Sequence, residues 1–164
     1  MIDRHIVDSI QSSGIDIILS LPCNMLSGIF IEIAQRNIVH IPVCREEEGV
    51  GIAAGAALAG KKPMLLMQNS GLGNSINTLA SLTLLYKLPL FIMMSHRGGP
   101  GEQILAQIPM GKASPELLKL LRIDFIKLSH SAELVNLGPF IKKTFEESLI
   151  HAAFLSRELW HEEK

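Results

Sequence analysis

The chain has 164 residues and a formal net charge of −1, so it is long enough to bury the core of one domain, and it has no basic tract to support nucleic-acid binding. Its first residues lack the pattern of a signal peptide, and no apolar run reaches the roughly 20 residues that cross a bilayer. The two cysteines, Cys23 and Cys44, form no C-x-x-C pair, which disfavours a disulfide framework or a zinc site and favours a reducing cytoplasm. Apolar residues make up 48% of the chain and aromatic residues only 5%. This composition suits buried parallel strands, and it also indicates some apolar surface for a partner.

Apolar spacing and Gly or Pro breaks predict strands and helices that alternate along most of the chain. The predicted strands are residues 15–21, 38–43, 63–67, 88–94 and 125–128. The predicted helices are residues 3–13, 25–36, 45–60, 76–86 and 116–121, the last opened by Ser114 as N-cap and Pro115 in the first turn. Residues 102–113 are predicted to be irregular, and residues 131 to about 160 to be helical with a break at Gly138-Pro139.

This alternation predicts an α/β fold with three layers, in which a mainly parallel sheet is flanked by helices on both faces. We expect residues 1–164 to form a single domain. Right-handed crossovers place the carboxyl ends of parallel strands at one edge of the sheet. The polar or Gly-rich loops at 22–24, 45–48, 68–75 and 95–101 are therefore expected to meet there.

The most informative stretch is residues 45–60, where three carboxylates, Glu46 to Glu48, stand at the predicted start of a helix. Negative charge is favoured at a helix N-terminus. The helix then contains Gly49, Gly51 and Gly55, each costing about 1 kcal/mol relative to alanine, which makes sense if another surface approaches within backbone distance. A tightly packed helix with an acidic start and a ligand site at a strand end are both compatible with these residues.

Two other loops contain candidate ligand groups. Residues 68–75 are Gly-rich and precede a helix, so they could cradle a phosphate, but they lack a complete G-x-G-x-x-G and the P-loop lysine, and a plain turn is the alternative. Arg97 follows a strand and offers a planar fork for a sulfonate, phosphonate or carboxylate. Gln107 and Lys112 could join it or be ordinary loop residues.

The remaining polar candidates have simpler interpretations. Cys23 is expected to be a small packing residue rather than a nucleophile, and Asn24 to cap the next helix. The histidines are scattered without ligand spacing, so we expect this chain to bind no metal.

Four segments, residues 21–24, 45–55, 68–74 and 96–101, together resemble the pyrimidine-binding domain of thiamine-diphosphate-dependent 2-oxoacid decarboxylases, over roughly residues 2–128. Within that family they are most similar to the alpha subunits of sulfopyruvate decarboxylases, and next to the N-terminal domains of phosphonopyruvate decarboxylases. The resemblance implies that Glu46, nine residues before Gly55, is the catalytic carboxyl that hydrogen-bonds N1′ of the cofactor's aminopyrimidine.

The resemblance also assigns the other site residues. Gly71 and Asn74 are expected beside the cofactor. The expected substrate-binding residues are Cys23, Asn24, Arg97, Gln107 and Lys112, with Arg97 on the distal anion. Several relatives carry an acidic residue where this chain has Asn24, so a hydrogen-bond role is expected there rather than acid–base work.

No Gly-Asp-Gly, the family's motif for holding Mg²⁺ and the diphosphate, occurs in the chain. The resemblance therefore implies a separate beta subunit that supplies this half of the site, and self-association of alpha chains. The expected reaction converts 3-sulfopyruvate, a small anionic 2-oxoacid, to sulfoacetaldehyde and CO₂ on the route to coenzyme M, in the cytoplasm. The alternatives are a phosphonopyruvate decarboxylase subunit, a non-catalytic partner of a thiamine-diphosphate enzyme and, with less support, a Rossmann-like nucleotide-binding module.

Overall fold

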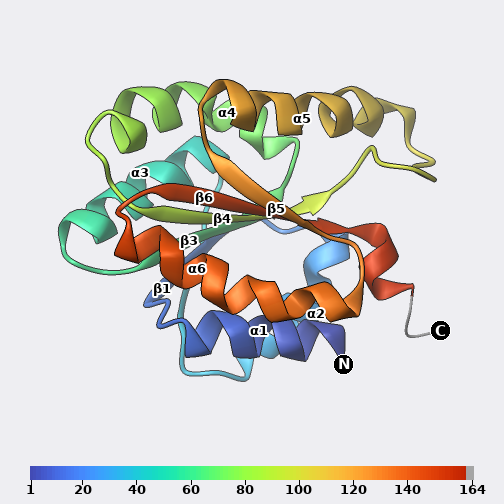
Figure 1. The fold of residues 1–164 in the computed structure, drawn as a ribbon, viewed down its shortest axis with the longest axis horizontal. Coiled ribbons are helices and arrows are strands. Elements are labelled where there is room, and N and C mark those ends of the chain that lie inside the picture. The colour runs from blue at the N-terminus through green and yellow to red at the C-terminus, as the bar shows by residue number, and fades with distance from the viewer. Residues whose placement is uncertain (162–164) are drawn as a thin grey trace.

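The computed structural model describes residues 1–161 as one parallel sheet with the strand order β2-β1-β3-β4-β6-β5 (Figure 1). The strands are β1 Ile17–Ser20, β2 Val39–Pro42, β3 Pro63–Gln68, β4 Leu90–His96, β5 Asp124–Leu128 and β6 Ile150–Ser156. The α-helices are α1 Ile2–Ser12, α2 Ser27–Ala34, α3 Glu46–Leu58, α4 Gly71–Thr78, α5 Ile108–Leu120 and α6 Leu137–Glu146. A π-helical segment, η2 Leu79–Leu84, continues α4, and the 3₁₀ turns are η1 Asn24–Leu26, η3 Leu105–Gln107, η4 Ser131–Asn136 and η5 Arg157–Trp160.

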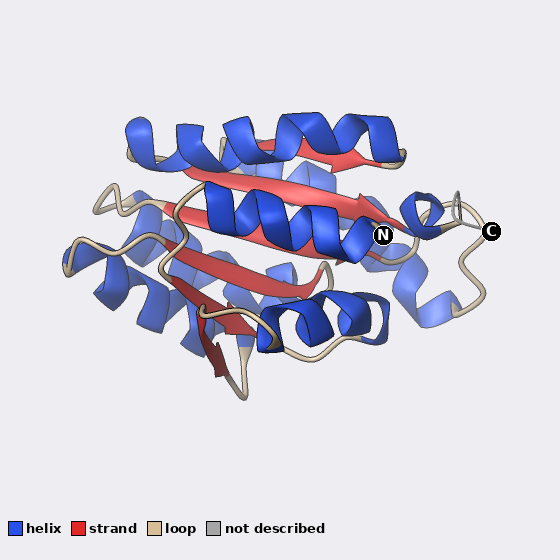
Figure 2. Ribbon diagram, turned by 90° about the horizontal axis from the view of Figure 1, so that it is seen from below, coloured by secondary structure: helices blue, strands red, loops and turns tan. Residues whose placement is uncertain are grey.

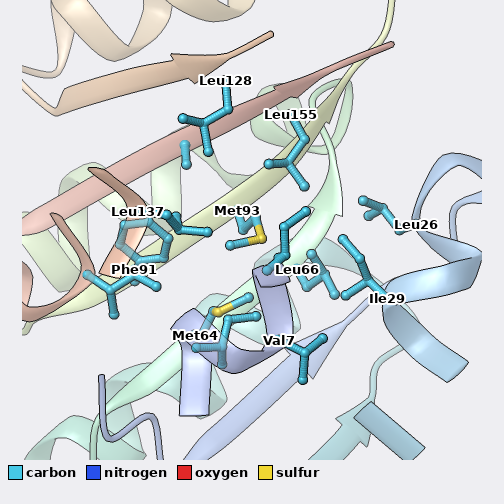
Figure 3. Packing of buried hydrophobic residues seen from close by; sticks show 14 of the residues in the cluster. Val7, Leu26, Ile29, Met64, Leu66, Phe91, Met93, Leu128, Leu137 and Leu155 are labelled. Atoms are coloured by element: carbon cyan, nitrogen blue, oxygen red, sulfur yellow. The ribbon is translucent and has the colours of Figure 1, made fainter. Parts of the chain in front are cut away.

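Helices cover both faces of the sheet, so the predicted three-layer α/β architecture is confirmed. Helices α1, α2 and α6 pack on one face, which Figure 2 views from below, and α3, α4 and α5 pack on the other. Successive strand residues point to opposite faces, so Met64, Leu66 and Met93 face α1 and α2 (Figure 3). Leu65 and Ile92 belong to the second core, beneath α3 and α4.

The predicted helical pattern over residues 131–160 is wrong, because it contains a central strand. Strand β6 lies between β4 and β5, and every one of its residues is buried. A strand covered on both faces shows a continuous apolar run without the period-two alternation that marks a half-exposed strand. Helix α6 is confined to Leu137–Glu146, with Gly138 and Pro139 in its first turn, where proline is tolerated.

Helix α5 also begins earlier than predicted, at Ile108, and contains Pro115 in its interior. Ser114 does not cap a helix, because its Oγ bonds the carbonyl oxygen of Met110 at 2.5 Å. Proline lacks the N–H that would bond the carbonyl four residues earlier. That carbonyl, of Gly111, instead accepts a hydrogen bond from His96 Nε2 at 3.1 Å, which compensates for part of the cost of the proline.

The strand order creates a switch point between β1 and β3. The chain leaves β1 toward β2 on one side and leaves β3 toward β4 on the other, and ligands of open α/β sheets bind where such connections diverge at the carboxyl ends of the strands. All pairings among the six strands are parallel, so the loops after β1, β3 and β4 lie at this edge. Within the described residues, no helix is both long and apolar enough to cross a membrane.

Candidate active site

Glu46 is the first residue of α3, and its side chain reaches the start of α4. Asn74 Nδ2 donates a hydrogen bond to Glu46 Oε2 at 2.9 Å. A Cβ atom at Gly71 would lie 2.4 Å from Glu46 Cγ and 2.6 Å from Oε1, so the carboxyl group packs directly against the glycine backbone. The structure therefore brings together the three residues expected at the cofactor, from two helices that begin at neighbouring positions along the sheet edge.

The other two carboxylates at the start of α3 are engaged elsewhere. Glu48 Oε2 accepts a hydrogen bond from the backbone N–H of Cys44 at 2.9 Å, and Glu47 Oε1 accepts one from Arg45 Nε at 2.5 Å. The hydrogen bond from Arg45 lowers the pKa of Glu47. Among the three carboxyl groups, Glu46 is the one directed at α4, so the geometry singles out the same residue as the motif spacing does.

A second polar cluster lies at the switch point between β1 and β3. Cys23 Sγ is 3.2 Å from Ser95 Oγ and 3.9 Å from Gln68 Oε1, while Gln68 Nε2 donates to Gln107 Oε1 at 2.8 Å. Cys23 is half-buried and also contacts the core, as its packing prediction implies. Gln68 and Ser95 are register partners on β3 and β4, and the signal that could have singled them out is a polar residue ending an apolar strand.

Asn69, which sequence reasoning did not single out, holds the loops of this site together. Its side chain is fully buried; Oδ1 accepts the N–H of Arg97 at 2.9 Å, and Nδ2 donates to the Arg97 carbonyl at 3.1 Å and to the Met110 carbonyl at 3.3 Å. The amide thus ties the loop after β4 and the start of α5 to the end of β3. Because buried amides need such partners, Asn69 fixes where Arg97 leaves the sheet.

Glycine is required where the loop after β4 meets α5. Gly98 has φ of +80°, and a Cβ there would lie 2.2 Å from the carbonyl oxygen of Gln107. A Cβ at Gly111 would lie 2.5 Å from the carbonyl carbon of Gly98. The two backbones therefore touch, and this contact sets the position of Gln107 beside Gln68.

Arg97 is paired within its own loop. Its Nε and Nη2 donate to the two carboxylate oxygens of Glu102 at 2.7 and 2.9 Å. Glu102 also accepts the N–H groups of Gly98 and Ile104, and its side chain is only 5% exposed. The pKa of Glu102 lies far below its usual range, mainly because Arg97 donates a hydrogen bond to its carboxylate. The role of Arg97 on a substrate anion stays a prediction.

Asn24 and Lys112 occupy different surroundings from those expected. Asn24 is the first residue of η1 and makes no capping hydrogen bond, so the prediction that it caps a helix is wrong; it lines a cavity of about 230 Å³ with Arg97 and Glu102. Lys112 lies exposed on α5, away from that cavity's lining, because the segment predicted to be irregular is helical. In the described part of the chain, no cluster of three or more His, Cys, Asp or Glu residues has a metal-binding arrangement.

An open parallel α/β sheet binds its ligands outside the carboxyl ends of its strands, and Glu46 and Gly71 lie at that edge. Residues 2–101 match the family described as "Thiamine pyrophosphate enzyme, N-terminal TPP binding domain". The chain belongs to this family.

Several relatives of known name are decarboxylases. The chain is 51% identical over 116 residues to "Sulfopyruvate decarboxylase subunit alpha" of Methanothermobacter thermautotrophicus, covering 70% of each chain. It is 37% identical to "Sulfopyruvate decarboxylase" of Methanosarcina acetivorans over 96% of this chain and 41% of that protein. It is 30% identical to "Phosphonopyruvate decarboxylase" of Streptomyces viridochromogenes over 73% of this chain and 31% of that protein.

Among solved structures, the chain is similar to the 2-oxoglutarate:ferredoxin oxidoreductase of Magnetococcus marinus, with a TM-score of 0.70 at 13% identity. The match covers 94% of this chain and 28% of that chain. At this identity the likeness concerns the fold, and it agrees with the six-stranded parallel sheet described above.

Proposed function

We propose that this chain is the alpha subunit of a thiamine-diphosphate-dependent decarboxylase that converts 3-sulfopyruvate to sulfoacetaldehyde and CO₂. The observation that carries the proposal is the placement of Glu46 against Gly71, with Asn74 on its second oxygen. The relatives named as sulfopyruvate decarboxylase alpha subunits support the choice of substrate. In this proposal the protein acts on the route to coenzyme M, in the cytoplasm.

The residues of the site fit a bound aminopyrimidine. Glu46 is half-buried, its Oε2 accepts a hydrogen bond from Asn74 and its side chain packs against Gly71, so the carboxyl group is directed at α4 and can share a proton with N1′ of the pyrimidine. Sharing a proton from a fixed position is the contribution that a general acid–base residue makes. The bound cofactor supplies the electron sink that makes loss of CO₂ feasible. Gly71 lets the carboxyl group lie directly against the start of α4, because a Cβ there would overlap Glu46 Cγ.

The outer surface of α3 fits a partner chain. Gly51 and Gly55 are exposed and a Cβ at either meets nothing within 4 Å, while Ile52 and Leu58 are exposed beside them. Exposed apolar and backbone surface of this kind suits close approach of a second protein. We assign this surface to a beta subunit that holds the diphosphate and Mg²⁺. The subunit names of the relatives support such a partner, and self-association of alpha chains belongs to the same proposal.

The assay that tests the proposed function measures CO₂ release from 3-sulfopyruvate by the complex of this chain, its partner, thiamine diphosphate and Mg²⁺. We expect Glu46→Gln to lower kcat by about 10²- to 10⁴-fold, the usual contribution of a positioned acid–base group. Glu48→Gln is the matched control, because Glu48 lies one half-turn further on and bonds the Cys44 N–H instead; it should keep nearly full activity. Full activity in Glu46→Gln would contradict the mechanism.

The second candidate substrate is phosphonopyruvate, which is motivated by the Streptomyces relatives. It carries a phosphonate in place of the sulfonate, and an arginine fork can bind either group. The ratio of kcat/KM for the two substrates decides between them. We expect the ratio to favour 3-sulfopyruvate, and a higher value for phosphonopyruvate would reverse the assignment. Unchanged turnover by the partner without this chain would instead identify the chain as a non-catalytic subunit.

A further inference from the structure

Arg157 occupies a position equivalent to that of Arg97 on the neighbouring strand. His96 and Ser156 are register partners at the carboxyl ends of β4 and β6, and Arg97 and Arg157 are the residues that follow them. Both arginines line the cavity of about 230 Å³ that also contains Asn24. The cavity therefore receives groups from the ends of three strands, β1, β4 and β6.

The two arginines differ in what already holds them. Arg97 is bound at both Nε and Nη2 by the Glu102 carboxylate, so its charge is largely balanced within the loop. Arg157 is exposed, and its side chain has no hydrogen bond or ion pair with any other residue in the range 1–161. With two arginines and one glutamate among its lining residues, the cavity has one positive charge in excess, and that charge belongs to Arg157.

The neighbouring charges leave this excess in place. Arg157 also borders a narrow adjoining cavity of about 10 Å³, lined by Lys127, Glu102 and Glu158. Glu158 is the nearest acid along the chain, but it lines the narrow cavity and not the larger one. In the narrow cavity, the positive charge of Lys127 offsets the negative charge of Glu158. The larger cavity is below the roughly 300–1,000 Å³ of sites for drug-sized ligands, so it suits a small anion.

We propose that Arg157, with Asn24 beside it, binds the distal anionic group of the substrate, and that Arg97 acts by shaping the loop through Glu102. This inference rests on the proposed function, and it adds a specificity-determining residue to that site. A sulfonate presents three acceptor oxygens, which match the donor fork of an unpaired guanidinium. The amide of Asn24 can donate to the same group without adding charge.

The test uses the complete complex and two measurements. Calorimetric titration with 3-sulfopropanoate, which has both anionic groups but no ketone, reports binding without turnover. Steady-state kinetics with 3-sulfopyruvate and pyruvate report selectivity for the distal anion. The variants are Arg157→Gln and Arg157→Lys, and the matched control is Arg122→Gln, an exposed arginine in the turn between α5 and β5 at the opposite edge of the sheet.

We expect Arg157→Gln to weaken 3-sulfopropanoate binding at least tenfold and to raise KM for 3-sulfopyruvate by a similar factor, with kcat changed less than threefold. For Arg157→Lys, the affinity and KM should lie between those of the wild type and Arg157→Gln, because lysine keeps the charge but lacks the planar fork of donors. Both values for Arg122→Gln should equal those of the wild type. The kcat/KM for pyruvate should stay unchanged, which a merely structural effect would not predict.

Equal binding of 3-sulfopropanoate by wild type and Arg157→Gln would overturn the inference, as would absence of binding to the wild type. If the wild type binds 3-sulfopropanoate through Arg157 but does not decarboxylate 3-sulfopyruvate, the anion site stands and the proposed function fails. If the wild type decarboxylates 3-sulfopyruvate and Arg157→Gln is kinetically identical, the proposed function stands and the inference fails.

Discussion

Glu46 and Gly71 form a complementary pair, because the side chain of one occupies the space in which the other lacks a Cβ. The family resemblance, in which the glutamate stands nine residues before a glycine, selected Glu46 from three neighbouring carboxylates, and its catalytic role stays a prediction. The contact with Gly71 depends on how α3 and α4 pack, and chain spacing carries no such information. Asn69 was missed for a related reason, since an asparagine in a Gly-rich loop looks like any turn residue until its burial is known.

The substitution Gly71→Ala tests this pair at the scale of single residues. The new Cβ requires Glu46 to move, so we expect activity to fall at least tenfold. The free energy of unfolding should fall by about 1–3 kcal/mol, because Gly71 is buried and its new Cβ would overlap Glu46 Cγ as well as the carboxyl group, and overpacking of this kind costs about that much. Enzyme assays and urea unfolding on the same preparation measure the two effects. Full activity would show that the carboxyl group does not need the glycine.

Strand β6 is the element that the sequence concealed most completely. Its residues, Ile150–Ser156, follow α6 after only three residues, with no Gly or Pro between the two elements, so a pattern search extends the helix through them. Buried strands lack the alternation that identifies exposed ones. Strands β1 to β5 and helices α1 to α3 lie close to their predicted bounds, and Gly14 and Gly60 fall in the turns that end α1 and α3.

His151 gives β6 a measurable pH dependence. It is 1% exposed, its Nδ1 lies 3.1 Å from Thr144 Oγ1, and its Nε2 is buried without a partner in the range 1–161. Burial is the main cause that lowers the pKa of His151, and Lys143 lowers it further, although Asp124 and Glu147 act in the opposite direction. The folded chain therefore resists protonation at this ring.

We expect the free energy of unfolding to decrease as the pH falls below about 6.5, the usual histidine pKa, because the unfolded chain then binds a proton that the folded chain excludes. The slope contributed by one such group is at most about 1.4 kcal/mol per pH unit. Urea unfolding between pH 7.5 and 5 should show a weaker dependence in His151→Phe. The control is His5→Gln, at an exposed position on α1, and a decrease of wild-type size in His151→Phe would exclude His151 as the cause.

At the scale of the whole molecule, the proposed function divides the site between this chain and a partner. Glu46 and the loops after β1, β3 and β4 lie at one edge of the sheet, and α3 has an exposed surface containing Gly51 and Gly55. The sequence predicted that another surface approaches this helix closely, and the structure shows that its glycines face two different surroundings. Gly49 meets the sheet, where a Cβ would lie 2.7 Å from Leu65 Cδ1, and the other two glycines face outward.

The substitution Gly55→Leu tests the outward surface. In the isolated chain we expect stability to stay the same or increase by up to about 1 kcal/mol, because leucine is favoured over glycine in a helix and a Cβ at this exposed position meets no atom within 4 Å. Binding to the partner should weaken at least tenfold if that surface is the interface. Analytical ultracentrifugation of the mixed chains measures the affinity, and Lys112→Leu, on the exposed side of α5, is the control. Equal affinities in all three chains would place the interface elsewhere.

The most direct test of the central claim is a structure of this chain with its partner subunit, thiamine diphosphate and Mg²⁺. The account predicts a Glu46 oxygen within about 2.6–3.2 Å of the aminopyrimidine N1′, the reach of a hydrogen bond, and contacts to the diphosphate and the metal from the partner. A Glu46 side chain directed into solvent, or a diphosphate bound by this chain alone, would contradict it.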